Sequence, residues 1–389
     1  MRAEFSLSAA VAGLVAVIVS YAGPSLVIFQ AASAAGLDEA HLASWIWAVS
    51  IGSGVSAAVL SWWSRAPIVT AWSTPGAALL VAGLPGVAWS EAVGAFLIAG
   101  VLIAALGASG LFESLMKRVP PAIAAAMLAG ILFRFGAQIF GAFAGEPMLV
   151  GAMVVVWAAV KRVSPRWAIA AVLVAGMVLA AGLGRLRLDG FAVALASPVW
   201  TTPSFSLATT LSLALPLAMV TLTGQFVPGI AVLRASGYAT PAGPLVWATS
   251  LAGAVLAPFG AHGVNLAAIT AAICSGPEAH VDPGKRWVAG FVLGLVYVTV
   301  GLFGATLAGV FAALPAALVA TVAGLALLGA IQNGLVAALG DVDGREPALL
   351  TFLVTASGTA FLGIGSAFWG LAVGLLAHAW FVRRRPCAA

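Results

Sequence analysis

Long apolar runs separated by short polar or Pro/Gly-rich breaks cover almost the whole chain. A helix crosses a hydrocarbon core of about 30 Å with roughly 20 residues, and the stretch 288–310 is apolar on every face. Backbone amides inside a bilayer have no water to bond, so only helices and closed barrels can span it. A barrel needs segments of about ten residues with strict alternation, which these runs lack. The sequence therefore predicts an all-α integral membrane protein.

The composition excludes a water-soluble fold. Hydrophobic residues make up 62% and charged residues 7% of the 389 residues, against roughly 45–50% and about 25% in soluble domains. The net charge of +5 is scattered over loops, so we expect no nucleic-acid partner. Cys274 and Cys387 support neither a disulfide framework nor a metal site. Nucleotide-binding loops, HExxH and Ser/His/Asp constellations are absent from the sequence, so we expect no enzyme, no cofactor and no metal.

The polar breaks define fourteen candidate membrane segments, seven in each half of the chain. The first seven are 7–33, 42–63, 69–82, 91–110, 120–141, 147–161 and 166–183. The second seven are 206–233, 241–258, 263–276, 286–309, 315–338, 347–361 and 364–382. An even number of segments puts both termini on one side of the membrane.

The distribution of basic residues tests this count, because cytoplasmic loops are enriched in Lys and Arg. With cytoplasmic termini, fourteen of the seventeen basic residues fall inside, two (Arg185 and Arg187) fall outside and Arg134 lies within a segment. The fourteen are Arg2, Arg65, Lys117, Arg118, Lys161, Arg162, Arg166, Arg234, Lys285, Arg286, Arg345, Arg383, Arg384 and Arg385. We therefore expect cytoplasmic N- and C-termini.

An internal repeat relates the two halves. A shift of 194 residues aligns Pro121-Ala122 with Pro315-Ala316 and Ala129-Gly130 with Ala323-Gly324, at the starts of the fifth and twelfth segments. Residues 1–184 and 206–389 are therefore predicted to be two seven-segment repeats joined by a linker. Seven is an odd number, so the repeats are expected to lie in opposite orientations.

The third and tenth segments are the shortest, and each opens with polar, irregular sequence. The first opens on 71–76, where Ser73 or Thr74 can cap a helix that begins near Pro75. The second opens on 260–265. Half-helices at matching positions expose N-terminal amides near mid-membrane, which attract anions. We expect an anionic substrate with one carboxylate; the alternative is that Gly and Pro merely permit close helix packing.

Two polar side chains stand out near these breaks. His262 is the one histidine at the start of a membrane segment, so it is a candidate for proton coupling or ligand binding, with a satisfied core histidine as the alternative. Gln225 lies midway along the eighth segment beside a break at Pro228-Gly229, and either binds substrate or bridges helices. The full set of predicted substrate-binding residues is Ser73, Thr74, Pro75, His262, Gly263, Asn265, Gln225, Ser25, Phe29 and Tyr21.

Three motifs carry a family resemblance: 71–77 (AWSTPGA), 224–229 (GQFVPG) and 260–266 (GAHGVNL). With them the chain resembles the benzoate/proton symporters, the BenE-type family, over essentially its whole length. More broadly it is similar to uracil, xanthine and sulfate carriers. That likeness implies a core domain of about 1–112 and 206–312 and a gate domain of about 119–184 and 314–382. It also implies that short extended strands precede the third and tenth half-helices and face each other.

The resemblance implies secondary active uptake of benzoate or a similar small aromatic carboxylate across the bacterial inner membrane. The core would move against the gate, and a proton gradient would supply the energy. A homodimer is compatible with the sequence. Nucleobase carriers have a glutamate where this chain has Gln225 and another near Thr270, so proton coupling falls to His262, Glu278, Asp282 or the protonated substrate. The alternatives are a carrier of another anion, such as a nucleobase or sulfate, and a passive anion channel.

Overall fold

The computed structural model describes residues 7–112, 114, 120–186, 193–267, 269–277, 279–359, 361 and 366–381, and this part of the chain is mostly helical. The elements of the first half are α1 (Leu7–Ala22), α2 (Pro24–Ala34), α3 (Glu39–Ser64), β1 (Thr70–Trp72), α4 (Thr74–Gly83), α5 (Trp89–Ala108), α7 (Pro121–Gly145), α8 (Pro147–Val163), η1 (Pro165–Trp167) and α9 (Ala168–Gly182). Those of the second half are α10 (Leu207–Thr209), η2 (Thr210–Ala214), α11 (Leu215–Thr221), η3 (Leu222–Phe226), α12 (Val227–Ala235), α13 (Ala242–Leu256), η4 (Ala257–Phe259), β2 (Val264–Leu266), α14 (Ile269–Ser275), η5 (Pro283–Lys285), α15 (Trp287–Leu302), α16 (Gly304–Ala312), α17 (Ala316–Gly340), α18 (Arg345–Ser357) and α19 (Ser366–Phe381).

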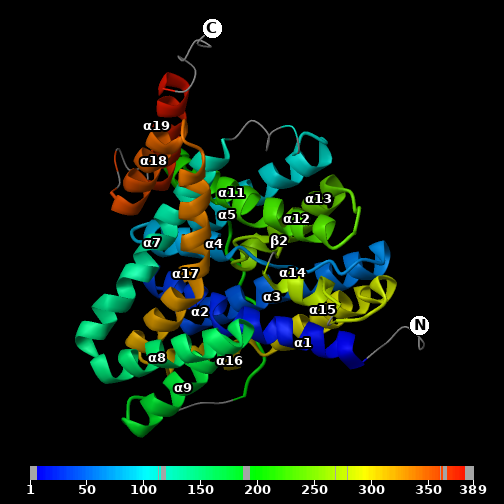
Figure 1. The fold of residues 1–389 in the computed structure, drawn as a ribbon, viewed down its shortest axis with the longest axis vertical. Coiled ribbons are helices and arrows are strands. Elements are labelled where there is room, and N and C mark those ends of the chain that lie inside the picture. Colours follow the sequence, from blue (N-terminus) through cyan, green and yellow to red (C-terminus); the bar gives the residue numbers. More distant parts are fainter. Residues whose placement is uncertain are drawn as a thin grey trace.

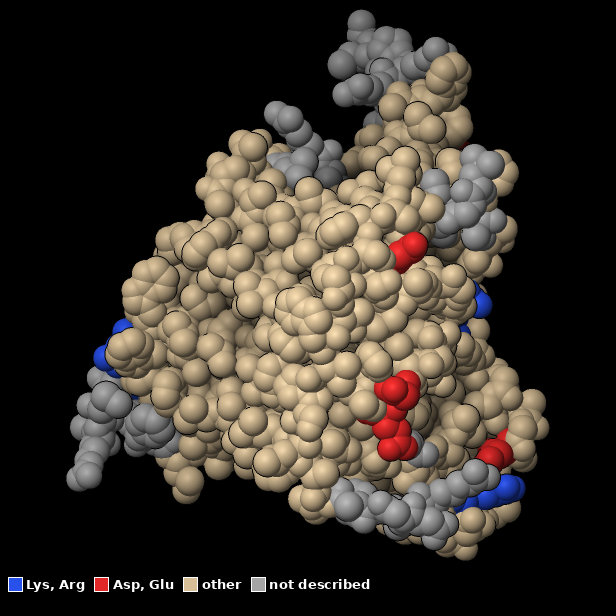
Figure 2. Space-filling model, turned by 180° about the vertical axis from the view of Figure 1, so that it is seen from behind, with Lys and Arg blue, Asp and Glu red and all other residues tan. Residues whose placement is uncertain are grey.

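The helices have the length and surface of a multi-pass membrane protein. Within the described ranges, eight are long and apolar enough to cross a bilayer, and further apolar helices of 10–17 residues accompany them. Phe140 and Leu376 are 75% and 71% exposed. Figure 2 shows a face on which acidic and basic side chains form only a few small patches. An apolar surface of this extent is rare on soluble monomers and suits contact with lipid.

The first predicted segment divides into two helices. α1 ends at Ala22 and α2 begins at Pro24. Proline has no amide hydrogen and fixes its own φ, so it starts a helix readily and interrupts one that runs through it. The junction positions Tyr21 and Ser25 one turn apart, where the Ser25 hydroxyl donates to the Tyr21 carbonyl.

The eighth predicted segment differs from the expectation. α12 continues through Pro228 and Gly229, so the predicted break at these residues was wrong. The irregularity lies one turn earlier, where η3 is a π-helical stretch, and η2 is a second one nearer the start of the segment. Pro228 is the second residue of α12 and has no backbone N–H to donate. The preceding π-turn already shifts the pattern of backbone hydrogen bonds, so the helix continues through this residue without that bond.

A two-stranded antiparallel ribbon lies near the middle of the molecule (Figure 1). Its register pairs Thr70 with Leu266, Ala71 with Asn265 and Trp72 with Val264. The ribbon joins the third and tenth predicted segments, and each strand precedes a short helix, α4 or α14. This is the arrangement that the resemblance implied.

The helices pack in matched pairs, four between the halves and one within each half. α3 packs against α15 and α5 against α13; α1 packs against α14 and α11 against α4; α8 packs against α9 and α18 against α19. Glycines permit the closest approach: a Cβ on Gly294 of α15 would lie 2.5 Å from the carbonyl oxygen of Gly54 in α3. In Figure 1, α7, α8, α9, α17, α18 and α19 occupy one side of the molecule, and α1, α3, α13 and α15 the other.

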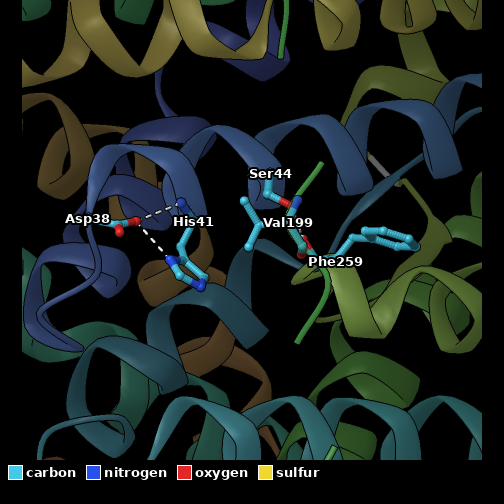
Figure 3. Close-up of polar contacts among 5 residues, drawn as sticks. All are labelled: Asp38, His41, Ser44, Val199 and Phe259. Atoms are coloured by element: carbon cyan, nitrogen blue, oxygen red, sulfur yellow. Dashed lines mark hydrogen bonds and ion pairs between the residues drawn. The ribbon is translucent and has the colours of Figure 1, made fainter. Parts of the chain in front are cut away.

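The linker between the halves is hydrogen-bonded to α3 and η4. Figure 3 shows Ser44 of α3 between Val199 of the linker and Phe259 of η4. The Ser44 hydroxyl accepts from Val199 N and donates to Phe259 O, each at 2.9 Å. Thr201 N also donates to Pro258 O at 2.8 Å. These bonds tie linker residues from mid-chain to helices of both halves.

Candidate functional site

A cavity of about 410 Å³ lies between β1, α4, η3 and α14 on one side and α7, α9 and α17 on the other. On one side it is lined by Val19, Ser20, Pro24, Ala71, Trp72, Thr74, Pro75, Gly224, Gln225, Ala267, Thr270 and Ile273. On the other it is lined by Leu128, Leu132, Pro165, Ile169, Ala170, Ala326, Leu327 and Ala330. A mostly apolar pocket with a few polar groups is the usual form of a small-molecule site.

The start of α4 forms one wall of this cavity. Ser73 is the N-cap of α4, and its hydroxyl accepts from Gly76 N at 3.0 Å, as the sequence predicted. The Thr221 hydroxyl donates to Ser73 Oγ at 3.1 Å, which ties α11 to the cap. Ser73 itself is fully buried behind the wall, whereas Thr74 and Pro75 line the cavity. The cap therefore holds the helix start, and the next two residues present it to the cavity.

Gln225 lines the cavity from within η3. A π-helical turn contains one residue more than the α-helical turn it replaces, so it turns side chains to new directions and is common at functional sites. Gly224 beside it also faces the cavity, where its missing side chain leaves room next to Pro75 and Leu128. Gln225 supplies both a hydrogen-bond donor and an acceptor to an otherwise apolar space.

His262 lies outside the cavity lining and is 2% exposed. Trp45 Nε1 donates to His262 Nδ1 at 2.9 Å, and His262 Nε2 lies 3.0 Å from the Ser73 carbonyl oxygen. An indole N–H can only donate, so Nδ1 is the acceptor, and Nε2 carries the ring hydrogen and donates to Ser73. The ring thus braces the cap of α4 from behind the wall.

The second half-helix begins later than the sequence indicated. We expected it directly after the polar break that contains His262, but α14 begins at Ile269, after β2. Pairing with β1 takes up Leu266, which the sequence pattern assigned to the helix. Gly260 and Gly263 have φ of 102° and 147°, which favour glycine, and they turn the chain from η4 into the strand.

Asn265 lies in the middle of β2, and neither atom of its side-chain amide has a hydrogen-bond partner among the described residues. The residue is fully buried. Its cross-strand partner Ala71 lines the cavity, and directly opposed residues of a ribbon point to one face. Asn265 therefore shares a face of the ribbon with Ala71 but does not itself line the cavity. Gly263 precedes β2 and is not part of the lining.

The three candidates from the first segment are not part of the cavity lining. The Tyr21 ring packs against Trp72 and Tyr297, with centroids 5.2 and 5.7 Å away, and its hydroxyl bonds that of Ser50. Phe29 packs edge-on against Phe311. Of the ten predicted residues, Thr74, Pro75 and Gln225 line the cavity, and the other seven do not; these are Ser73, His262, Gly263, Asn265, Ser25, Phe29 and Tyr21.

Several lining residues were not predicted. Thr270 of α14 lines the cavity. The resemblance to nucleobase carriers pointed to this position, but Thr270 was not among the predicted substrate-binding residues. The opposite wall comes largely from Leu128 and Leu132 of α7 and from Ala326 and Ala330 of α17. These two helices are the ones that the 194-residue repeat aligned, so the repeat is the sequence signal that could have identified this wall.

The electrostatic character of the cavity comes from uncharged groups. Around it, the part of the chain that the structure describes contributes no Asp, Glu, Lys, Arg or His to the lining. Groups of three or more potential metal ligands are also absent from the described residues. The start of α4 carries a partial positive charge that stabilises an anion by about 0.3–1 kcal/mol in typical cases.

Comparison with known proteins identifies the family. A family model described as "Benzoate membrane transport protein" matches residues 3–380. The chain is 44% identical over 389 residues to the benzoate membrane transport protein of Acinetobacter baylyi, covering 100% of this chain and 98% of the relative. It is 47% identical over 363 residues to the inner membrane protein YdcO of Escherichia coli, covering 93% of each.

Two solved structures share the fold at low sequence identity. The transmembrane domain of the cyanobacterial bicarbonate transporter BicA matches with a TM-score of 0.63 at 14% identity, covering 95% of this chain and 97% of that chain. SLC26A9 matches with a TM-score of 0.60 at 13% identity, covering 95% and 65%. The chain therefore belongs to the benzoate membrane transport protein family, a family of membrane transporters and not of enzymes.

Proposed function

We propose that the chain carries benzoate or a similar small aromatic carboxylate into the cell across the bacterial inner membrane, coupled to protons. The observation that carries this proposal is the cavity, whose apolar walls suit an aromatic ring and whose Gln225 suits a carboxyl group. The printed name of the Acinetobacter baylyi relative supports the substrate class. Sulfate fits less well, because a buried dianion needs positive partners that the described lining lacks.

The membrane arrangement that we propose is fourteen segments in two inverted repeats with both termini in the cytoplasm. The helix pairs support it: α3 and α15 are the second and eleventh segments, and α13 and α5 are their repeat equivalents, the ninth and fourth. The pairs α8–α9 and α18–α19 are related in the same way. Contacts that recur under exchange of the halves are those that an inverted repeat produces.

Alternating access by motion of a core against a gate is the proposed mechanism. The core consists of about 1–112 and 206–312, and the gate of about 119–184 and 314–382. The cavity lies where these domains meet: Thr74 and Gln225 line it from the core, and Leu132 and Ala326 line it from the gate. A site shared by two domains changes its access when one domain moves against the other.

Uptake of labelled benzoate into proteoliposomes tests the proposal. We expect saturable accumulation that requires an inward proton gradient and exceeds that of protein-free liposomes. The absence of gradient-dependent uptake would overturn the proposal. Stronger competition by uracil or sulfate than by unlabelled benzoate would favour a carrier of another anion, and uptake without saturation would favour a passive channel.

A further inference from the structure

We infer that the cavity takes its substrate as the neutral carboxylic acid, so that the transported proton travels on the substrate and not on a side chain. The inference rests on the proposed function and names the protonation state that the site recognises. On one side of the membrane the carboxylate gains a proton from water, the neutral acid crosses, and the acid returns the proton to water on the other side. One carboxylate and one proton therefore move together, and no net charge crosses.

The lining of the cavity gives a carboxylate no ionic partner. Its polar side chains are Ser20, Trp72, Thr74, Gln225 and Thr270, and no acidic or basic side chain lines it within the described residues. An isolated charge in such surroundings is disfavoured on the order of a thousandfold or more relative to water. A neutral acid avoids that cost.

The helix ends offset little of this cost. Pro75 has no amide hydrogen, and Gly76 N is already used by Ser73 Oγ. Ala77 N donates to Ser73 O at 2.8 Å. α14 has only seven residues. A helix N-terminus favours an anion by about two- to fivefold in typical cases, far below what an unpaired carboxylate requires.

His262 is held in an uncharged form by its neighbours. A proton added to Nδ1 would point at the N–H of Trp45, which lies 2.9 Å away as a donor. Nε2 is occupied by the Ser73 carbonyl oxygen. Charging the ring would therefore break one of the two bonds that fix it, and the ring lies behind the wall of the cavity.

The Gln225 amide complements an acid better than a carboxylate. A carboxylic acid has an O–H that donates to the amide oxygen and a carbonyl that accepts from the amide nitrogen, which closes a ring of two hydrogen bonds. A carboxylate has acceptors only, so it leaves the amide oxygen without a donor. The side chain that most clearly distinguishes this cavity thus prefers the protonated substrate.

Equilibrium binding to the purified full chain in nanodiscs tests the inference with three ligands. For benzoate, the apparent Kd should rise about tenfold per pH unit above the acid's own dissociation range, following the fraction of neutral acid. Benzamide, which is neutral throughout, should compete equally well at every pH. Benzenesulfonate, which has the same ring and a permanent charge, should not compete.

Benzenesulfonate that competes as well as benzoate would overturn the inference, since the site would then accept an anion. A benzoate Kd that does not change with pH would overturn it too. Saturable benzoate binding in both cases would leave the proposed function standing. No binding of benzoate at any pH would instead overturn the proposed function.

A pair of variants connects the result to the amide. Gln225→Leu should weaken benzoate and benzamide alike, by about tenfold to a hundredfold for two lost hydrogen bonds, and should keep the slope of benzoate affinity against pH. Gln332→Leu, on the exposed surface of α17, is the matched control and should leave both affinities unchanged. If Gln225→Leu leaves both affinities unchanged, the amide is not the partner. If the variant fails to fold, the three ligands on the unaltered protein still decide.

Discussion

The imidazole ring of His262 connects the two halves of the chain, because its Nε2–H donates to the backbone carbonyl of Ser73 at 3.0 Å. Ser73 caps α4, and Trp45 of α3 holds the other ring nitrogen. Three elements that are distant in sequence therefore meet at one buried side chain. This arrangement favours a role for His262 as a support of the cavity wall.

Two substitutions of His262 separate support from proton coupling. His262→Ala should lower the free energy of unfolding by about 1–3 kcal/mol, since it leaves the Trp45 N–H and the Ser73 carbonyl without their partner. His262→Gln, whose amide can both accept and donate, should recover part of that loss. Uptake of benzoate by the glutamine variant should keep the pH profile of the unaltered protein, measured in proteoliposomes. A shifted pH profile in the glutamine variant would show that His262 takes part in proton coupling.

Asn265 should limit stability while serving transport. Its buried amide has no partner among the described residues, and an unsatisfied buried polar group costs about 1–3 kcal/mol. Asn265→Leu should therefore raise the melting temperature in detergent, and it should reduce benzoate uptake because it alters the ribbon that carries the lining residues Ala71 and Trp72. Asn333→Leu on the exposed surface of α17 is the control and should change neither. Full uptake by Asn265→Leu would show that the amide has no role in transport.

The cap at the start of α3 predicts a pH dependence of stability outside the membrane segments. Asp38 Oδ1 accepts from the His41 backbone N–H at 2.9 Å, and this bond, together with the His41 ring, holds the pKa of Asp38 below its usual range. The ionised carboxylate therefore stabilises the fold above the unfolded pKa of about 3.9, and this contribution is lost as the pH falls through the lowered folded value.

Replacement of Asp38 makes this measurable. Asp38→Ala should reduce the free energy of unfolding by about 0.5–2 kcal/mol at neutral pH, and the difference from the unaltered protein should shrink below about pH 4. Asp38→Asn keeps a capping oxygen without a titrating group, so its stability should depend less on acid. A difference between Asp38→Ala and the unaltered protein that stays constant from neutral to strongly acidic pH would contradict the assigned role.

The close approach of α3 and α15 predicts which glycines cannot be enlarged. A Cβ on Gly294 would lie 2.5 Å from Gly54 O and 2.6 Å from Ala58 N, both of which are backbone atoms that cannot move alone. Gly294→Ala should destabilise the protein by about 1–3 kcal/mol, as overpacking does. Gly329→Ala on α17, where a Cβ meets nothing within 4 Å, should be neutral or slightly stabilising. Equal melting temperatures for the two variants would show that the helices can separate.

The sequence was informative where local chemistry decides structure. Ser73 caps the helix that begins at Thr74, as expected, because capping depends on neighbouring residues alone. The start of α14 was misplaced because strand pairing between β1 and β2 joins residues almost 200 positions apart. The largely apolar sequences of α7 and α17 hid which residues line the cavity, since in lipid no continuous polar face marks the outside. The π-turn at Gln225 has no local signature either.

Gly224 offers a test of the cavity that leaves the fold intact. A Cβ at this position would lie 3.5 Å from Pro75 Cγ and 3.7 Å from Leu128 Cδ2, which are ordinary contact distances, so Gly224→Ala should fold normally. Gly224→Phe would place a ring in the space that the substrate ring needs. We expect it to weaken benzoate binding by more than about tenfold, corresponding to at least about 1.4 kcal/mol, with little change in melting temperature. Gly309→Phe, at a position with nothing within 4 Å of a Cβ, is the control and should bind normally. Normal binding by Gly224→Phe would mean that the substrate occupies a different part of the molecule, because a ring at residue 224 and a ligand between Pro75 and Leu128 exclude each other.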